Sequence, residues 1–275
     1  MDRKKQLRRL GYALSVAIAL ATTTAQAATS FSLTLNFTGG LSASQQAVFA
    51  DAATFWEGHI TGYQPGIHGI SGITIDASGS YIDGTGGTLG EGGPTAGVIR
   101  NGYTLTTDGT IKLETADLTN MENNGSLYDV ILHEMAHVMG FGTLWTNNNV
   151  YVDGSGQYTG ANALATYQNE FNQPGATFVP VELGGGTGTA NGHWDEVNNG
   201  SGLTGITDSL GRDMRDELMT GWLNNPANIF VSRTTLASFT DIGFVAVPEP
   251  AGAVLLLIGV AGIVVRRRWR GETAA

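Results

Sequence analysis

Alternating apolar and polar residues open the central part of the chain and then give way to a helical period. Residues 31–37, FSLTLNF, place an apolar side chain at every second position, which predicts a half-buried β-strand. In residues 39–60 the apolar positions recur every three to four residues, which predicts an amphipathic helix. Ser42, with Gln45 three residues later, is typical of a capping box at a helix start. The predicted stripe of this helix consists of Val48, Ala52, Phe55 and His59.

Further strand-like segments follow the first helix. Residues 72–77, GITIDA, predict a strand, whereas residues 78–97 are so rich in glycine that we expect a long irregular loop. Two more strands are predicted at residues 97–105 and 109–114, joined through a turn at Asp108-Gly109. Strands that follow a first helix in this way predict a mixed sheet.

The most apolar helical segment is residues 126–142, SLYDVILHEMAHVMGFG. Its apolar side chains cover the helix nearly all round, which is typical of a buried helix. Ser126, with Asp129 three residues later, predicts the amino-terminal cap. The helix is expected to end at Gly140 or Gly142, since glycine readily adopts the left-handed conformation that ends helices.

Three polar residues interrupt this buried helix, and burying polar groups costs free energy unless they find partners. His133 and His137 are four residues apart, so their rings share one helix face and can bind one metal ion. Glu134 follows the first histidine and can bond to a water molecule on that ion. Zinc in such a site lowers the pKa of its water toward about 7, and the glutamate accepts the proton as the water attacks a carbonyl group. The alternative is a set of hydrogen-bonded core residues without metal.

A catalytic zinc ion of this kind needs a third protein ligand and one open position. His59 lies on the first predicted helix and His68 in a turn. His193 follows the glycine-rich segment GGGTGTANG, whose backbone can approach the site closely, and Glu170 is a carboxylate alternative. The residue pattern alone leaves these candidates open.

The order of motifs resembles the leishmanolysin family of metzincin zinc peptidases. The resemblance is carried by HEMAHVMGFGTLW at 133–145, GHWDE at 192–196 and DELMTG at 216–221. Gly140 completes the H-E-x-x-H-x-x-G opening of the metzincin signature. Most metzincins carry the third histidine three residues after this glycine, where Thr143 stands here; the leishmanolysin variant carries it after an insertion.

This resemblance implies an endopeptidase in which His133, His137 and His193 bind one Zn²⁺ ion. It further implies that Glu134 is the general base and that Met219, in a tight turn, lies beneath the metal. Eukaryotic members of the family are rich in cysteine, whereas this chain has none, so no thiol can keep it latent.

The resemblance also implies an α+β fold of two lobes with a cleft between them. The amino-terminal lobe, residues 28–142, would contain a mixed twisted sheet and the active-site helix. The carboxy-terminal lobe, residues 143–247, would be irregular and helical and would contain the third histidine. Its last helix is expected to begin near Ser232 or Thr234, since either is a good cap.

Both ends of the chain read as targeting segments. Residues 1–27 combine a basic start, a short apolar run and small residues at Ala25 and Ala27, which predicts a secretory signal peptide cleaved before Ala28. An uncleaved membrane anchor is the alternative.

Residues 248–275 join a Pro-Glu-Pro turn, fifteen apolar residues at 251–265 and a cluster of arginines. The apolar stretch would form about 22 Å of helix, short of a typical ~30 Å hydrocarbon core. The order of parts resembles the PEP-CTERM sorting tail of Gram-negative secreted proteins. That resemblance implies a protein at the cell surface or in the extracellular matrix, with at least transient membrane contact and a membrane-embedded exosortase as partner. A permanent short transmembrane anchor is the alternative.

The net charge of the central part of the chain excludes one class of partner. Residues 28–247 contain five basic and twenty-one acidic side chains, a net charge of −16, which excludes a nucleic-acid partner. We therefore expect a secreted zinc endopeptidase whose substrate is an extracellular protein or peptide. The alternative is a non-catalytic zinc-binding surface or matrix protein that keeps the fold. Glu134 argues against it, because such a protein has no need of a base beside the ion.

Overall fold

The computed structural model describes residues 31–247, except 197–199, 201 and 225. The predicted signal peptide and sorting tail lie outside the described residues. Within residues 31–247, no described helix is long and apolar enough to cross a membrane.

The elements follow one another in the order strand, helix, strands, helices, and then a half of the chain with little regular structure. They are β1 (Ser32–Gly39), α1 (Ala43–His59), β2 (Ile60–Tyr63), β3 (Gly72–Ser80), β4 (Gly90–Arg100), β5 (Tyr103–Glu114), α2 (Leu118–Asn124), α3 (Leu127–Met139), β6 (Gln157–Tyr158), α4 (Ala161–Glu170), β7 (Val179–Pro180), α5 (Arg233–Asp241) and β8 (Phe244–Ala246). Short 3₁₀ turns lie at Met214–Asp216 and Pro226–Asn228.

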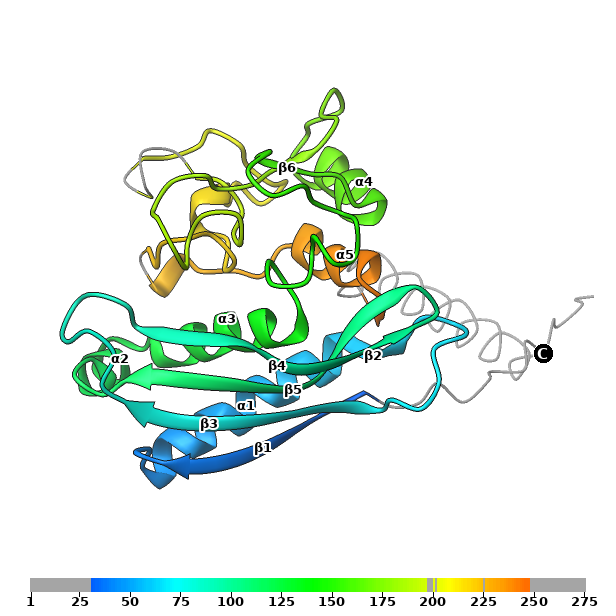
Figure 1. Cartoon of the computed structure of the whole chain (residues 1–275). Coiled ribbons are helices and arrows are strands. Elements are labelled where there is room, and N and C mark those ends of the chain that lie inside the picture. The colour runs from blue at the N-terminus through cyan, green and yellow to red at the C-terminus, as the bar shows by residue number, and fades with distance from the viewer. Residues whose placement is uncertain (1–30, 197–199, 201, 225, 248–275) are drawn as a thin grey trace, which may run out of the picture.

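The main sheet has the strand order β1-β3-β5-β4. β1, β3 and β5 are parallel, while β4 is antiparallel to β5 and forms one edge of the sheet (Figure 1). This is the mixed sheet that the sequence predicts, and the α+β fold class is confirmed. The edge strand β4 lies beside α3, on the side of the sheet that faces the irregular half of the chain (Figure 1).

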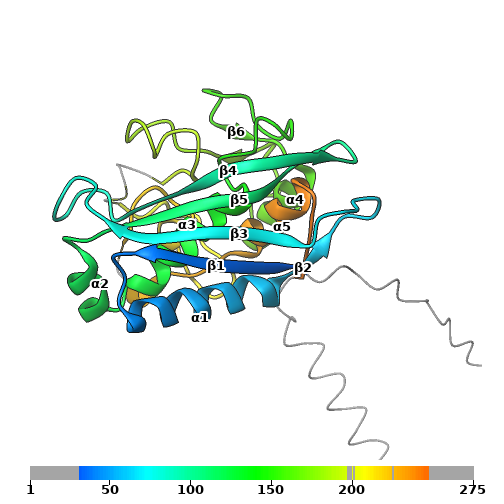
Figure 2. The same cartoon turned by 60° about the horizontal axis from the view of Figure 1, so that its bottom comes forward.

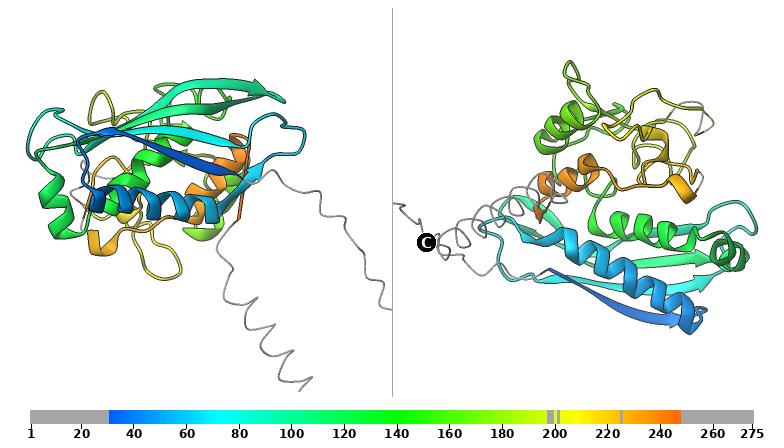
Figure 3. Two further views of the ribbon diagram at one scale, coloured as in Figure 1. Left: turned by 90° about the horizontal axis from the view of Figure 1, so that it is seen from below. Right: turned by 180° about the vertical axis from the view of Figure 1, so that it is seen from behind.

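Helices α1 and α3 cover the same face of the sheet, as the views from below and behind show (Figures 2 and 3). The indole Nε1 of Trp56, fully buried on α1, donates a 3.1 Å hydrogen bond to the carbonyl oxygen of Leu132 on α3. The predicted capping box of α1 is confirmed, because Ser42 and Gln45 exchange side chain-to-backbone hydrogen bonds of 3.2 and 2.8 Å. The buried face of α1 differs from the predicted stripe. It consists of Gln45, Phe49, Ala52, Ala53 and Trp56.

The predicted turn at Asp108-Gly109 is wrong. These residues lie inside β5, and the hairpin turn between β4 and β5 is Asn101-Gly102. Asn101 and Gly102 have φ values of 49° and 83°, and a two-residue hairpin turn of this type needs positive φ at both positions. Gly109 is a glycine for another reason: a Cβ atom there would overlap the side chain of Val138 on α3.

The glycine-rich segment 78–97 is mostly strand rather than loop. β3 continues to Ser80 and β4 begins at Gly90, which leaves only residues 81–89 as a connection. The buried carboxylate of Glu114 shapes this connection, since it accepts hydrogen bonds from the backbone N–H groups of residues 82, 83 and 84. Glycine in β4 permits close packing, because Gly92 lies directly against α3.

Helix α3 begins without the predicted cap. Ser126 occupies the cap position, but its side chain makes no capping hydrogen bond, and its buried hydroxyl has no partner in the described part of the chain. Helix α2 ends at Asn124, and only Gly125 separates it from Ser126, whose helical conformation does not suit a cap. At its other end, α3 stops at Met139, and Gly140 takes the left-handed conformation with φ 116°.

The second half of the chain, from residue 143, packs above α3 and β4 (Figure 1). Its core is aromatic: Trp145 and Trp194 stack with ring centroids 5.0 Å apart, and Phe141 and Tyr158 pack edge-on against Trp194. Helix α5 begins after the N-cap residue Ser232, one of the two predicted starts. β8 then pairs with β2, so the end of the described chain returns to the sheet half.

Candidate metal centre

Three histidine rings meet between α3 and the irregular half of the chain. The Nε2 atom of His133 lies 2.9 Å from that of His137, and both lie 3.0 Å from Nε2 of His193. His137 and His193 are buried and His133 is partly buried. Among the described residues, these are the only three histidine, cysteine or acidic side chains placed closely enough to share a metal ion.

The opposite nitrogen of each ring faces a backbone carbonyl oxygen. Nδ1 of His133, His137 and His193 lies 2.7, 2.9 and 2.8 Å from the carbonyl oxygens of Leu218, Phe141 and Thr189, respectively. A carbonyl oxygen only accepts, so each Nδ1 carries the proton and donates it. In a neutral imidazole this leaves each Nε2 with a free lone pair.

Three lone pairs that converge within 3.0 Å repel one another unless a cation lies between them. Protonation of a ring does not relieve this, because burial holds the pKa of His133 at about 4 and that of His193 at about 3, and holds that of His137 well below its usual value. Neutral imidazole nitrogens are preferred zinc ligands, and carbonyl oxygens that fix the ring orientation are a common feature of such sites. The residues present therefore fit a metal ion.

A close backbone contact between Gly142 and Gly192 positions His193. Gly142 has φ 70°, and a Cβ atom on it would overlap the backbone of Gly192. The next residue after the histidine, Trp194, is fully buried in the aromatic core and donates from Nε1 to the hydroxyl of Thr235 at 2.8 Å. The histidine is thus fixed from both sides.

The segment around Met219 links two of the histidines. Leu218 supplies the carbonyl oxygen for His133, and the carbonyl oxygen of Met219 accepts from the backbone N–H of Trp194, next to His193, at 2.9 Å. Met219 is fully buried. Its turn is therefore bound to the strand-like segment that contains one ligand candidate and to the helix that contains the other two.

The fully buried carboxylate of Glu217 holds this turn in place. One oxygen accepts from the N–H of Met219 at 2.6 Å. The other accepts from the N–H and hydroxyl of Ser232 at 2.9 and 2.8 Å, and from the hydroxyl of Thr235 at 2.6 Å. Burial raises its pKa, and these four donors act in the opposite direction. One side chain thereby joins the Met219 turn to the start of α5.

Glu134 points from α3 toward the edge strand. Burial, with a contribution from the nearby charge of Glu91, raises its pKa to about 8, while a hydrogen bond from the backbone N–H of Gly92 acts to lower it. A Cβ atom on Gly92 would lie 2.9 Å from Oε2 of Glu134, so only glycine permits this approach. Glu134 is buried, with 7% of the residue exposed.

The other candidates for a third ligand lie elsewhere. His59 bonds to the carbonyl oxygen of Phe55 within α1, and His68 is exposed. The carboxylate of Glu170 accepts hydrogen bonds from the backbone N–H groups of Arg233 and Thr234, so it caps α5.

Sequence reasoning missed Glu217 and Gly92. Glu217 stands in the quoted DELMTG motif, but the side chains that bond to it come from α5, and nothing local indicates that contact. The glycine density around Gly92 predicts a loop, although glycine in a strand also marks a place that another backbone approaches closely.

Comparison with protein families identifies one match. The sequence model described as Leishmanolysin matches residues 103–258, which is more than half of the chain and includes all three histidines. No curated protein matches the chain at a significant level.

Proposed function

Because the chain belongs to the leishmanolysin family of peptidases, we propose that it is an exported zinc endopeptidase of the metzincin type. Membership of that family and the buried histidine cluster make the protein a metallopeptidase. The observation that carries the proposal is the convergence of three unprotonated Nε2 atoms, with the carboxyl group of Glu134 on the residue next to His133 in α3.

In the proposed mechanism His133, His137 and His193 hold the zinc ion. When bound, zinc lowers the pKa of a water molecule on its open position and polarises the carbonyl group of the substrate. Glu134 accepts the proton of the attacking water and returns it to the departing amine. The Gly92 N–H orients the carboxylate, and its raised proton affinity suits it to this transfer.

Peptide bonds of extracellular proteins are the proposed substrates. The cleft side of the site is bordered by an edge strand, β4, whose outer backbone groups are unpaired within the sheet. A peptide in extended conformation can bond to such an edge, and that arrangement favours cleavage within a chain over removal of a terminal residue.

Export and sorting complete the proposal. Residues 1–27 would direct secretion, and residues 248–275 would deliver the protein to the cell surface through an exosortase. Fractionation of cells that express the full chain tests this. Protein retained in the cytoplasm would contradict it, and surface protein with an intact tail would favour the permanent anchor.

The enzymatic test compares the full-length parent with Glu134→Ala and with Asp153→Ala, which removes an exposed carboxylate outside the histidine cluster. Zinc content and casein cleavage are measured on the same preparations. We expect one zinc per chain in all three and cleavage in the parent and Asp153→Ala only. Zinc in all three without cleavage in any would favour a non-catalytic zinc-binding surface protein. Absence of zinc from the parent would contradict the site assignment.

A further inference from the structure

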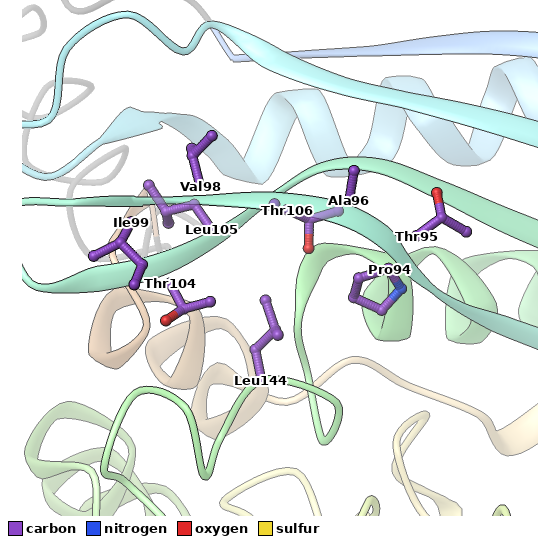
Figure 4. Close-up of a pocket in the computed structure, with 10 residues that line it drawn as sticks. Pro94, Thr95, Ala96, Val98, Ile99, Thr104, Leu105, Thr106 and Leu144 are labelled. Atoms are coloured by element: carbon purple, nitrogen blue, oxygen red, sulfur yellow. The ribbon is translucent and has the colours of Figure 1, made fainter.

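A hollow of about 320 Å³ lies where the β4–β5 hairpin passes the segment that follows α3 (Figure 4). Pro94, Thr104, Thr106 and Leu144 reach into the same space from the two strands and from the chain beyond α3 (Figure 4). The remaining lining residues are also uncharged. The hollow is therefore suited to an apolar group.

Its shape comes from two irregularities in the sheet. The register between β4 and β5 shifts between Pro94 and Ala96 and again between Ala96 and Gly97. Irregularities of this kind bend a strand and redirect its side chains, and they are frequent beside functional sites. The edge strand thus departs from regular pairing at the hollow itself.

Two side chains at the hollow leave contacts unmade within the described chain. The hydroxyl of Thr106, a residue with no exposed surface, has no hydrogen-bond partner and points into this space (Figure 4). At the rim, the side chain of Ile99 is 70% exposed. A ligand that fills the hollow would cover the isoleucine.

The hollow and the candidate catalytic site share the edge strand β4. Gly92 of β4 bonds to the carboxyl group of Glu134, and Pro94 lies only two residues further along the same strand. Pro94 and Val98, which line the hollow, lie two and six residues after Gly92. Extended chains rise by about 3.3 Å per residue, so a peptide paired along β4 would reach the hollow two to six residues from the bond that is cleaved beside Glu134.

We propose that this hollow is a substrate subsite that binds an apolar side chain two to six residues from the cleaved bond. The proposal rests on the peptidase function proposed above. It assigns Ile99 and Leu144 as specificity-determining residues, and it predicts that substrates with a leucine-like side chain at that position are preferred over those with glycine or a charged residue.

The test uses the full-length protein and two matched substitutions. Ile99→Asp places a charge at the rim, and Val152→Asp changes a side chain that is similarly exposed, at 72%, but lies outside the hollow. Because both positions are exposed, neither change should prevent folding. Leu144→Ala is a third variant that enlarges the hollow without adding charge.

Cleavage sites in casein are mapped by mass spectrometry, and kcat/KM is then measured for a pair of peptides with leucine or glycine at the preferred position. We expect the parent and Val152→Asp to favour leucine about tenfold or more, and Ile99→Asp to lose most of this preference. No apolar preference in the parent, or the same preference in Ile99→Asp and Leu144→Ala as in the parent, would overturn the proposal.

Binding separates this proposal from the peptidase function. An array of casein-derived peptides is probed with Glu134→Ala, alone and combined with Ile99→Asp or Val152→Asp. Leucine-dependent binding that only Ile99→Asp abolishes supports the subsite even if the parent cleaves nothing, in which case the peptidase function alone fails. Binding that is insensitive to Ile99→Asp overturns the subsite, whether or not the parent cleaves casein.

Discussion

Nδ1 of His133 donates a 2.7 Å hydrogen bond to the carbonyl oxygen of Leu218, which lies 85 residues further along the chain. This bond fixes the tautomer of a ring on α3 through the turn that contains Met219. The geometry of the metal centre therefore depends on the position of that turn, and Glu217 is the residue that determines it.

Replacement of Glu217 by glutamine should weaken both folding and metal binding. Both carboxylate oxygens now accept hydrogen bonds, and the amide nitrogen of glutamine would face one set of these donors without being able to accept from it. We therefore expect the free energy of unfolding to fall by about 2 kcal/mol or more. Displacement of Leu218 should weaken zinc binding by about 10- to 100-fold, as for other groups that orient a metal ligand. Urea unfolding and zinc competition measure the two effects.

Ser232→Ala is the control for this variant. It removes the cap of α5 and one donor to Glu217, but leaves the bond to Met219 intact. It should cost about 1 kcal/mol of stability and leave zinc affinity unchanged. If Glu217→Gln lowers stability without changing zinc affinity, Glu217 supports α5 alone.

His193→Ala should reduce zinc affinity by more than about a hundredfold, because it removes a ligand itself rather than a group that orients one. It should also abolish most of the rise in melting temperature that zinc gives the parent, since that rise depends on affinity for the folded state. His68→Ala, which removes an exposed histidine outside the cluster, is the control. Equal zinc affinity in both variants would exclude His193 as a ligand.

Gly142→Ala should disturb the approach of His193. The substitution strains a backbone with φ 70° and also forces a methyl group into Gly192. Gly154→Ala is matched in φ, at 75°, but meets no atom within 4 Å, so it isolates the backbone strain of about 1 kcal/mol. We expect Gly142→Ala to lose distinctly more stability in urea unfolding, and to lose zinc affinity, which Gly154→Ala should retain. Equal effects would show that the contact between the two glycines is unimportant.

Glu196 should make the protein less stable as pH rises through neutrality. Burial raises the pKa of this carboxyl to about 8, and one of its oxygens has no hydrogen-bond partner among the described residues. Between its usual pKa of 4.5 and about 8 the folded protein binds this proton more tightly than the unfolded chain. The contribution of Glu196 to stability is therefore fully present below pH 4.5, and it is lost as the pH rises from 4.5 to about 8.

Glu196→Gln should flatten that part of the pH profile and raise stability at pH 8 relative to the parent. Asp153→Asn, a neutralisation at an exposed position, should leave the profile parallel to that of the parent. Thermal unfolding of zinc-loaded protein from pH 5 to 8 compares the three. A Glu196→Gln profile that stays parallel to the parent would contradict the raised pKa.

Local sequence determined the parts of this protein in which neighbours along the chain supply the physical cause. Alternation gives β1, the capping box gives the start of α1, and the spacing of His133 and His137 puts both rings on one face of α3. These relationships span at most a few residues, so helix and strand periodicity suffice to predict them. Local prediction was wrong at Asp108 and Ser126, where neighbouring strands and helices replace the predicted turn and cap. It was also wrong for the buried stripe of α1 and for the loop expected at residues 78–97, because packing against the sheet and against α3 decided both.

Tertiary structure alone decided how the metal centre closes. Sequence left the third histidine open among several candidates, because ring convergence depends on the contact of Gly142 with Gly192 and on the aromatic packing of Trp194. The protonation state of the rings depends on carbonyl oxygens such as that of Leu218, distant in sequence. These contacts are stabilised by burial of side chains throughout the core. They therefore cannot be predicted from any short segment of the sequence.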